Sequence, residues 1–355
     1  MTGESSPAVS GQQVFGPDAA LTAGPPLVDP EALYRRACSQ PDGPAGFYNR
    51  NIRVAAGARA VNVRIPIEGA DVMDYRQWPE PQVLAVVASR VTSVPALHWV
   101  SVCPAYQIHE YIDGEVLDQL APRGRPLPAH VPSDVARLFA QLRAIPREAL
   151  PYAPGGLDDD PQRFARRVWG ASRQAYRDHR SSFHHLFRRL RIPADPFEPL
   201  DESCNSLQAR QFRLTHGDLH RKNMIIRDGE TVFLDWELAL YGDPLYDVAI
   251  HLHKMNYLPA ERERFVAAWT AAEPDAAHSG WEHDVEIYLA QARVRSAVLD
   301  AVRYAKIIAD GGCAPDSERL LVRKLAQKLQ EAAPVWELPP AIDEAEVDAA
   351  LRGWR

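Results

Sequence analysis

Three polar residues around one hairpin, Asp218, Asn223 and Asp235, have the types and the spacing that phosphoryl transfer requires. They lie in the stretch HGDLHRKNMIIRDGETVFLDWELALYGDPLYD, residues 216–247. A strand pattern runs into Asp228 and Gly229, a strong hairpin-turn signal, and a second strand pattern runs back. If the turn is centred near Gly229, Asn223 lies opposite or diagonal to Asp235. An amide oxygen and a carboxylate then converge on one point.

That point suits a hard cation such as Mg²⁺, which takes oxygen ligands and is completed by water and substrate phosphates. Asp218 precedes Asn223 by five residues, close enough to contact a hydroxyl aimed at the same phosphate. Metal ligands on one side and a carboxylate on the acceptor side are the parts that phosphoryl transfer needs. Asp and Asn are also common turn residues, so the prediction depends on all three at these spacings.

The stretch resembles the aminoglycoside phosphotransferase and choline kinase family, a branch of the protein-kinase-like fold whose catalytic loop reads HGDxxxxN. The resemblance implies that Asp218 is the catalytic base or hydroxyl-orienting group and that Asn223 and Asp235 are the magnesium ligands. His216 and Asp247 are implied to brace the catalytic loop. The segment LDWE stands where protein kinases have DFG. Such replacement is common in the antibiotic kinase branch and argues against a protein substrate.

A strand hairpin is predicted at residues 46–67, where apolar residues alternate on both sides of a turn that contains Gly57. The resemblance implies that this hairpin covers the nucleotide, although Gly46 and Gly57 form no GxGxxG motif. Arg64 stands where protein kinases carry the lysine that holds the α and β phosphates. Its alternative is an exposed strand-end cation.

A helix is predicted to begin near Pro79 and Glu80, which makes Glu80 the candidate partner of Arg64 or, alternatively, a first-turn acid favoured by the helix dipole. Further on, a strand pattern breaks at Asp113 and Gly114. This segment resembles the family's hinge, in which backbone groups bind the nucleobase, although an edge strand ending in a turn would look the same. The hinge residues would be His109, Glu110 and Tyr111.

The chain after the hinge is predicted to be helical. An arginine-rich run at residues 163–191, interleaved with apolar residues, predicts paired amphipathic helices with a basic outer face. This face is either simply solvated or, by the resemblance, part of an acceptor wall that disfavours polycationic acceptors. Four residues at helical spacing are acceptor-pocket candidates by the same resemblance: Arg295, Asp300, Arg303 and Tyr304.

These elements predict an α+β, two-lobed protein-kinase-like fold with a small antiparallel β N-lobe and a larger, mainly helical C-lobe. A chain of 355 residues is long enough for two such lobes. The resemblance covers roughly residues 46–332. The expected boundaries are a flexible leader at 1–28, a nucleotide-binding lobe at 29–112, a catalytic and acceptor-binding helical lobe at 113–335 and a tail at 336–355.

The composition gives no support to several classes of protein. A net charge of −7 and a pI near 6.0 give no reason to expect nucleic acid as a partner. No apolar run approaches the roughly 20 residues that span a bilayer, and the N-terminus lacks the features of a secretory signal. The four cysteines have no CxxC spacing. We therefore expect a reduced, cytoplasmic protein, either a monomer or a homodimer.

The predicted function is transfer of the γ-phosphoryl group of ATP or GTP, with Mg²⁺, to a hydroxyl of a small molecule. By the resemblance this acceptor is an antibiotic (aminoglycoside, nucleoside or similar), modified for resistance or self-protection. The alternative within the same chemistry is a metabolic kinase for a sugar, choline, ethanolamine or homoserine. From other classes, a non-catalytic nucleotide-binding regulator and a nucleic-acid module stay open.

Overall fold

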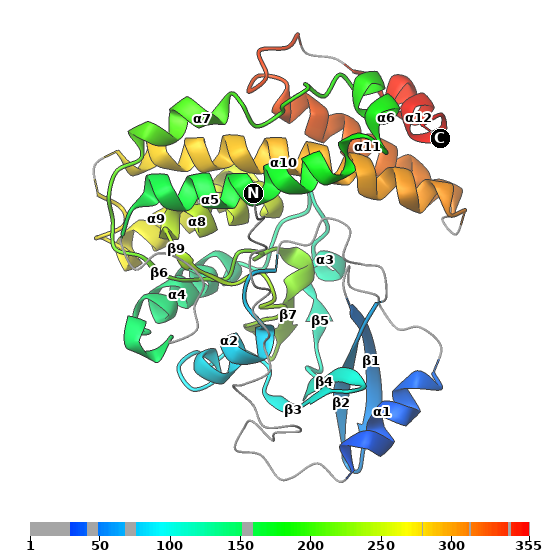
Figure 1. The fold of residues 1–355 in the computed structure, drawn as a ribbon. Helices are drawn as coiled ribbons and strands as arrows, with labels where there is room; N and C mark the ends of the chain where they lie inside the picture. The colour runs from blue at the N-terminus through cyan, green and yellow to red at the C-terminus, as the bar shows by residue number, and fades with distance from the viewer. Residues whose placement is uncertain are drawn as a thin grey trace, which may run out of the picture.

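The computed structural model describes residues 29–40, 49–67, 76–150, 159–278, 280–311, 314–339 and 342–354. The predicted leader and Gly46 lie outside these residues. A small part, mainly sheet, lies below a larger part in which helices dominate (Figure 1). This arrangement agrees with the predicted α+β fold class.

The small part contains a four-stranded antiparallel sheet in the order β1-β2-β4-β3. Its strands are β1 (Asn49–Ala56), β2 (Arg59–Pro66), β3 (Leu97–Val102) and β4 (Ala105–Glu110). Strands β1 and β2 pair from Asn49 with Pro66 to Ala56 with Arg59, which confirms the predicted hairpin. Gly57 in its turn has φ +68°, a conformation that glycine adopts without a steric penalty. Helix α1 (Pro30–Cys38) packs on this sheet through Leu33 and Ala37.

Helix α2 (Glu80–Val87) begins at the residue expected from the sequence. Its buried residues Val83, Leu84 and Val87 do not join the small core under the sheet. Together with Trp78 and Leu97, they belong to the large hydrophobic core of the helical part. The large core therefore extends from the helical part to α2 and to the start of β3, while the sheet keeps a small core of its own.

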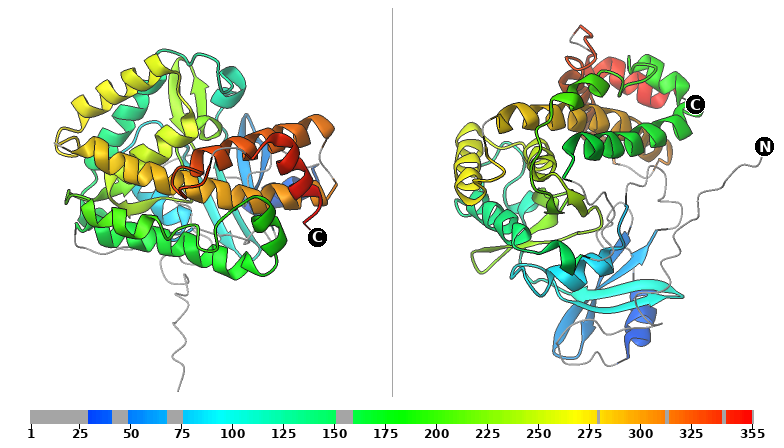
Figure 2. Two further views of the ribbon diagram at one scale, coloured as in Figure 1. Left: turned by 90° about the horizontal axis from the view of Figure 1, so that it is seen from above. Right: turned by 60° about the vertical axis from the view of Figure 1, so that its left-hand side comes forward.

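The larger part is built around α10 (Trp281–Ala309), a helix of 29 residues that packs against α8 (Pro244–Met255) and α11 (Pro315–Ala332). Figure 2 shows this layer of helices from above and from the side. The other helices are α3 (Leu117–Leu120), α4 (Val131–Arg143), α5 (Pro161–Arg180), α6 (His184–Arg189), α7 (Leu200–Ser203), α9 (Pro259–Ala272) and α12 (Glu344–Arg352). Three single 3₁₀ turns accompany them: η1 (Arg147–Ala149), η2 (Cys204–Ser206) and η3 (Arg221–Asn223).

The segment expected to be a tail carries α12, which packs against α11 and α6. Val347, Ala350 and Leu351 on α12 are buried. After the helix, Trp354 stacks on Phe183 with ring centroids 4.7 Å apart. Residues 344–354 are therefore part of the helical body.

Residues 216–247, which contain Asp218, Asn223 and Asp235, lie within and between two short sheets of the larger part. Strands β5 (Glu115–Val116), β7 (Met224–Arg227) and β8 (Glu230–Phe233) form one sheet, and β6 (Arg213–Thr215) pairs with β9 (Leu240–Gly242) in the other. The β7–β8 hairpin turns at Asp228 and Gly229, as predicted, with φ +52° and +80°. Because Met224 pairs with Phe233, Asn223 lies opposite Leu234, and Asp235 follows one residue later.

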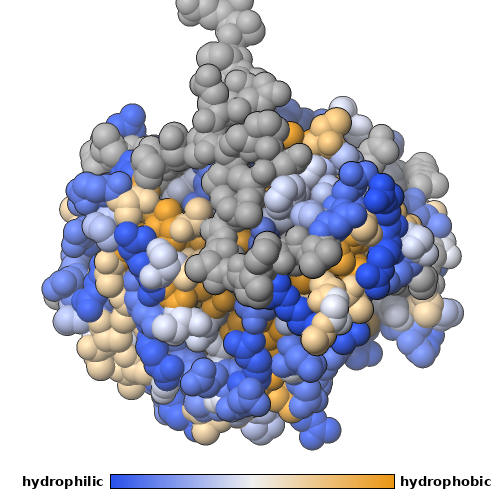
Figure 3. Space-filling view, turned by 90° about the horizontal axis from the view of Figure 1, so that it is seen from below, coloured by the Kyte–Doolittle hydropathy of each residue, from blue (hydrophilic) through white to orange (hydrophobic). Residues whose placement is uncertain are grey.

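None of the described helices is both long and apolar enough to span a bilayer. Seen from the side of the small part, hydrophilic residues cover much of the described surface and hydrophobic residues appear in groups between them (Figure 3).

Candidate active site

The loop between β6 and η3 is anchored to α8 and to the residue after β8 by hydrogen bonds. The main-chain N–H groups of His216 and Gly217 donate to the two carboxylate oxygens of Asp247, at 2.7 and 2.9 Å. The His216 ring donates through Nε2 to the carbonyl of Leu234 and accepts at Nδ1 from the N–H of Asp218. Burial lowers the pKa of His216 to about 4, so this ring is neutral at physiological pH. These contacts fix the direction in which the Asp218 side chain projects from the loop.

Gly217 allows the loop to pass close to the turn that precedes β9. Its φ is +75°, and a Cβ atom at this position would lie 2.2 Å from the carbonyl oxygen of Leu238. Any other residue would be strained in backbone conformation and would also collide with main chain. The glycine of the HGD motif is thus required by geometry.

Asp218 points a carboxylate into a partly open site, with 15% of its side chain exposed. It forms an ion pair with Lys254 of α8, its Oδ2 lies 3.5 Å from Nε2 of His220, and Asn223 donates to its main-chain oxygen at 2.9 Å. Burial alone would raise the pKa of Asp218, but the charges of Lys254 and His220 outweigh it and hold that pKa well below its ordinary value. The carboxylate is ionised and can accept a hydrogen bond from a hydroxyl.

Asn223 and Asp235, the predicted metal ligands, flank the β7–β8 hairpin on its two sides, and Asn223 contacts the Asp218 carboxylate at 3.4 Å. The Asn223 amide nitrogen faces Asp218, which leaves its oxygen without a hydrogen bond among the described residues. Asp235 has φ +66°, and its side chain is 29% exposed. No group of three His, Cys, Asp or Glu side chains suited to a metal ion occurs in the described part of the chain. Two oxygen ligands completed by phosphates and water fit Mg²⁺ better than a metal enclosed by protein alone.

Arg64 joins the small sheet to this hairpin and to α2. Its guanidinium donates to Glu80 and to Asp235, each at 2.8 Å, and lies 3.5 Å from Glu237. The predicted proximity of Arg64 and Glu80 is thus observed, and both side chains are buried. Glu80 also accepts from the N–H of Trp236 at 3.0 Å. Although burial opposes it, the three carboxylates raise the pKa of Arg64, which stays charged.

The three carboxylates around Arg64 crowd negative charge into a small buried volume. Burial, and next the charge of Asp235, raise the pKa of Glu237 to about 8. Asn49 of β1 donates to the same carboxylate at 3.0 Å. A divalent cation bound here would relieve this crowding, so the residues fit a magnesium ion. The contact of Glu237 with Arg64 was not foreseen from the sequence, where its only signal is its position two residues after Asp235.

The predicted hinge forms the end of β4. His109 is buried, with Nε2 2.8 Å from the Gln107 amide oxygen. The N–H of Glu110 already donates to the carbonyl of Ala96 at 2.8 Å, and its carboxylate accepts from Arg227 at 3.1 Å. Arg53 lies over the Tyr111 ring, 4.9 Å from its centroid. The binding of a nucleobase by these residues stays a prediction.

The four predicted acceptor residues all lie on α10, on the side that approaches α8 and α11. Arg295 donates to the Tyr246 hydroxyl at 3.0 Å. Tyr304 donates to Asp300 at 3.3 Å, and Arg303 lies 3.8 Å from the same carboxylate. Lys328 of α11 completes this group with an ion pair to Asp300. The charges of Arg295 and Arg303 act on Lys254, which pairs with Asp218, so this part of α10 lies in the neighbourhood of Asp218.

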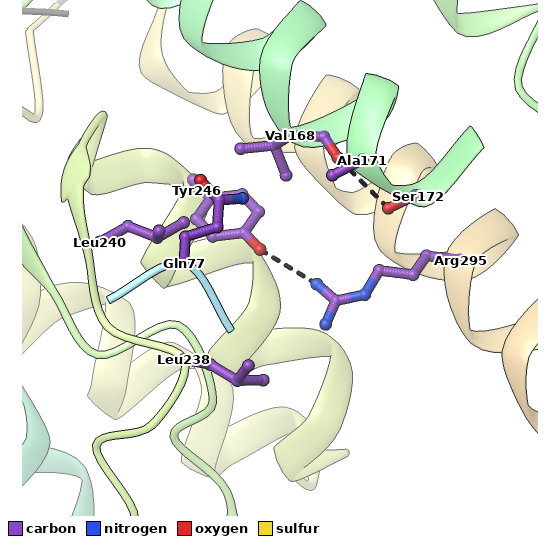
Figure 4. Close-up of a pocket in the computed structure, with 8 residues that line it drawn as sticks. All are labelled: Gln77, Val168, Ala171, Ser172, Leu238, Leu240, Tyr246 and Arg295. Atoms are coloured by element: carbon purple, nitrogen blue, oxygen red, sulfur yellow. Dashed lines mark hydrogen bonds between the residues drawn. The ribbon is translucent and has the colours of Figure 1, made fainter. Parts of the chain in front are cut away.

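A small cavity of about 10 Å³ opens beside Arg295 (Figure 4). The figure shows the Tyr246 hydroxyl and the Arg295 guanidinium facing one another, with α5 on one side and the segment before and in β9 on the other. The residues around this cavity are Gln77, Val168, Ala171, Ser172, Leu238, Leu240, Tyr246 and Arg295. It marks the place where α5, α8 and α10 come together.

The arginine-rich run forms α5 and α6, two amphipathic helices as predicted. Several of its arginines are neutralised locally. Arg173 pairs with Asp195 at 3.2 Å and with Asp201 at 2.9 Å, and Arg191 pairs with Glu346 of α12 at 2.6 Å. These arginines hold neighbouring segments together and do not contact Asp218 or Asn223.

Known proteins resemble this chain at the level of family and of fold. A family model described as "Phosphotransferase enzyme family" matches residues 42–282. No curated protein matches the sequence. Among solved structures, a protein described as a candidate aminoglycoside phosphotransferase from Ralstonia eutropha JMP134 has a TM-score of 0.55 at 17% identity, over 86% of this chain and 97% of that one. A choline/ethanolamine kinase family protein from Mesorhizobium loti has a TM-score of 0.55 at 15% identity, over 88% and 93%.

A third structure is a thermostable mutant of the aminoglycoside phosphotransferase APH(4)-Ia in ternary complex with ADP and hygromycin B. It has a TM-score of 0.52 at 16% identity, over 91% of this chain and 97% of that one. At such identities the similarity establishes the fold alone. The predicted two-lobed protein-kinase-like fold is thereby confirmed.

Proposed function

The chain belongs to the phosphotransferase enzyme family, the one that its HGDxxxxN loop resembles, and we propose that it phosphorylates a hydroxyl group of an antibiotic. The phosphoryl donor is ATP or GTP, bound in the crevice between the two parts of the molecule with Mg²⁺. The observation that carries this proposal is the fixed position of an ionised Asp218 beside Asn223, with Asp235 held by Arg64 on the hairpin that follows.

In the proposed reaction, Asp218 accepts a hydrogen bond from the acceptor hydroxyl and orients its oxygen toward the γ-phosphorus. The new O–P bond forms as the bond to the β–γ bridging oxygen breaks, the hydroxyl proton passes to Asp218, and the nucleoside diphosphate leaves. Asn223 and Asp235 would hold the magnesium ion, which neutralises charge on the phosphates. Arg64 keeps Asp235 in place and is near enough to add positive charge there.

His216 and Asp247 have no part in the chemistry of this scheme. Their contacts are with main-chain groups of the loop, and the neutral His216 ring faces the carbonyl of Leu234. They position Asp218, which alone touches the reacting hydroxyl. The hinge main chain at residues 109–111 would receive the nucleobase.

We place the reaction in the cytoplasm, where ATP and GTP are available. The three cysteines that the structure describes, Cys38, Cys103 and Cys204, are free thiols, as in a reducing compartment.

The test is turnover of nucleotide by the purified protein. With MgATP or MgGTP and a panel of hydroxylated antibiotics, sugars, choline and homoserine, we expect formation of diphosphate and of one phosphorylated acceptor, both abolished by EDTA. Asp235→Asn should raise the magnesium concentration needed for half-maximal rate about tenfold or more, since a charged ligand is lost. Binding of nucleotide without phosphorylation of any acceptor would instead support a non-catalytic regulator, and use of a panel metabolite in place of every antibiotic would support a metabolic kinase.

A further inference from the structure

We propose that the acceptor carries an anionic group, a carboxylate or a phosphate, bound by Lys254, Arg303, Lys328 and Arg123 beside Asp218. This inference rests on the proposed phosphotransfer and names the class of molecule that receives the phosphoryl group. The four side chains come from three helices and one loop that are far apart in the sequence. They are called the cationic band below.

The band begins at Asp218 itself. Lys254 is the penultimate residue of α8, and its ammonium group pairs with the Asp218 carboxylate. Arg123, in the loop after α3, donates to the main-chain oxygen of Lys254 at 3.1 Å. The end of α8 and the loop that precedes α4 therefore meet next to the carboxylate that would receive the acceptor hydroxyl.

The band continues along α10 and α11 around one buried carboxylate. Asp300 pairs with Lys328 and also lies 3.8 Å from Arg303. The side chains of Lys254, Arg303 and Lys328 are 28%, 24% and 17% exposed. They are thus open to a ligand yet sheltered from bulk water. Ion pairs with a bound anion are stronger in such surroundings than at a fully exposed surface.

The charges that act on Lys254 and on the neighbouring His253 are mainly positive. Burial lowers the pKa of Lys254, and although Asp218 opposes this, Arg295 and Arg303 lower it further. The pKa of His253, next to Lys254, falls to about 3 because of burial and because of the charges of Lys328, Lys254 and Arg123. An anionic ligand would reduce the repulsion among these cations, whereas a polycation would increase it.

The arginine-rich run of α5 and α6 is the second positively charged region, and it cannot bind the anionic group of the acceptor in the same way. Arg173 of α5 pairs with Asp195 and Asp201, and Arg191, which follows α6, pairs with Glu346. In the cationic band, Asp300 lies between Arg303 and Lys328, and Asp218, which pairs with Lys254, is assigned to the acceptor hydroxyl. An acceptor whose hydroxyl lies at Asp218 and whose anionic group points toward α11 would match both the Asp218 carboxylate and the cations of the band.

Isothermal titration with matched small probes tests the proposal. The nucleotide site is first saturated with ADP and Mg²⁺, and glycerol 3-phosphate, glycerate, glycerol and choline are titrated in turn. We expect the two anionic probes to bind at least tenfold more tightly than glycerol, and choline to bind most weakly. This preference should weaken as salt is added, because salt screens partly exposed charges.

Two variants locate the binding. Arg303→Met and Lys328→Met should each reduce the affinity for glycerol 3-phosphate at least tenfold. The matched control is Arg319→Met, which removes an exposed cation from the same helix as Lys328 and should leave that affinity unchanged. ADP binding, measured on every variant, reports whether the chain is folded.

Equal binding of glycerol and glycerol 3-phosphate, tighter binding of choline, absence of anion binding by a protein that binds ADP, or full affinity in both variants would each overturn the proposal. Failure of the wild-type protein to bind ADP would contradict the phosphotransfer function instead. The two proposals are therefore tested separately.

Discussion

Lys254 at the end of α8 forms an ion pair with Asp218, the aspartate of the HGD loop. The two residues are 36 positions apart, and the contact exists because α8 runs back beneath the loop that it follows. The pair keeps a buried carboxylate ionised where burial alone would favour its protonated form. Lys254 thereby governs the charge state of the proposed base.

Lys254→Met should shift the pH dependence of the reaction. In the wild-type protein the pKa of Asp218 is depressed, so the carboxylate stays ionised throughout the mildly acidic range. Without Lys254, burial raises that pKa, and protonation removes the active form at a higher pH. We expect the acid limb of the kcat/KM profile to move upward by about one pH unit or more. An unchanged limb would contradict this role, and the exposed Lys222→Met serves as the control.

Asp218→Asn should lower kcat by roughly 10²–10⁴-fold, the usual contribution of general acid–base catalysis. The nucleotide affinity should stay close to that of the wild type, since Asp218 contacts Lys254, His220 and Asn223 rather than the hinge. Steady-state rates and nucleotide titration measure the two quantities. Asp228→Asn, in the exposed turn of the neighbouring hairpin, is the matched control. A variant at position 218 that keeps most of its rate would rule out the assignment.

Gly217→Ala should destabilise the fold and disable the loop. The added Cβ atom would meet the Leu238 carbonyl, and the positive φ adds a further backbone penalty. Gly229 also has positive φ, but a Cβ atom there would meet nothing within 4 Å. Gly229→Ala should therefore cost about 1–2 kcal/mol from backbone strain alone. Gly217→Ala should cost clearly more in denaturant unfolding, and equal losses would show that the contact with Leu238 is unimportant.

Arg64→Lys should weaken nucleotide binding despite keeping the charge. Two different nitrogens of Arg64 bond to Glu80 and Asp235, and a single ammonium group does not reproduce this fork. We expect about a tenfold loss of affinity for the magnesium nucleotide, equivalent to about 1.4 kcal/mol. Fluorescence titration measures it, with the exposed Arg90→Lys as the control. Unchanged affinity would show that charge alone is sufficient at this position.

Asp284→Ala should destabilise the helical part strongly. Arg210 is buried between Asp243, at 2.8 Å, and Asp284, which lies in the first turn of α10. Removing one acid leaves a buried cation only partly compensated, which typically costs about 3–5 kcal/mol. Asp316→Ala, from an exposed pair on α11, should cost no more than about 1 kcal/mol. Urea unfolding monitored by circular dichroism distinguishes the two.

The sequence was most informative where structure depends on neighbouring residues. The β1–β2 and β7–β8 hairpins, the start of α2 and the amphipathic α5 follow from local turn, cap and periodicity signals. The register of the second hairpin differs by one residue from the expectation, because a two-residue turn at Asp228 and Gly229 pairs Arg227 with Glu230. Asn223 consequently lies opposite Leu234. The positive φ of Asp235, which no local pattern signals, then redirects its side chain.

Contacts between distant elements could not be predicted in the same way. The contact of Glu237 with Arg64 depends on how the small sheet lies over the hairpin. The contact of Lys254 with Asp218 depends on where α8 ends. Arg295, Asp300, Arg303 and Tyr304 were placed on one helix from their spacing. Their partner Lys328 comes from another helix, for which spacing carries no information. Charge composition likewise could not separate the paired arginines of α5 from the cationic band.

The core shared by the two parts of the molecule limits how the chain can be divided. Trp78, Val83 and Leu84 precede the expected boundary at residue 112, yet they belong to the hydrophobic core that is formed mainly by residues after it. A fragment ending at that boundary would present these side chains to water, and its complement would lose the surface that covers them. In an exchange of lobes between homologous enzymes, the residues that cover α2 would therefore have to come from the same parent as α2 itself.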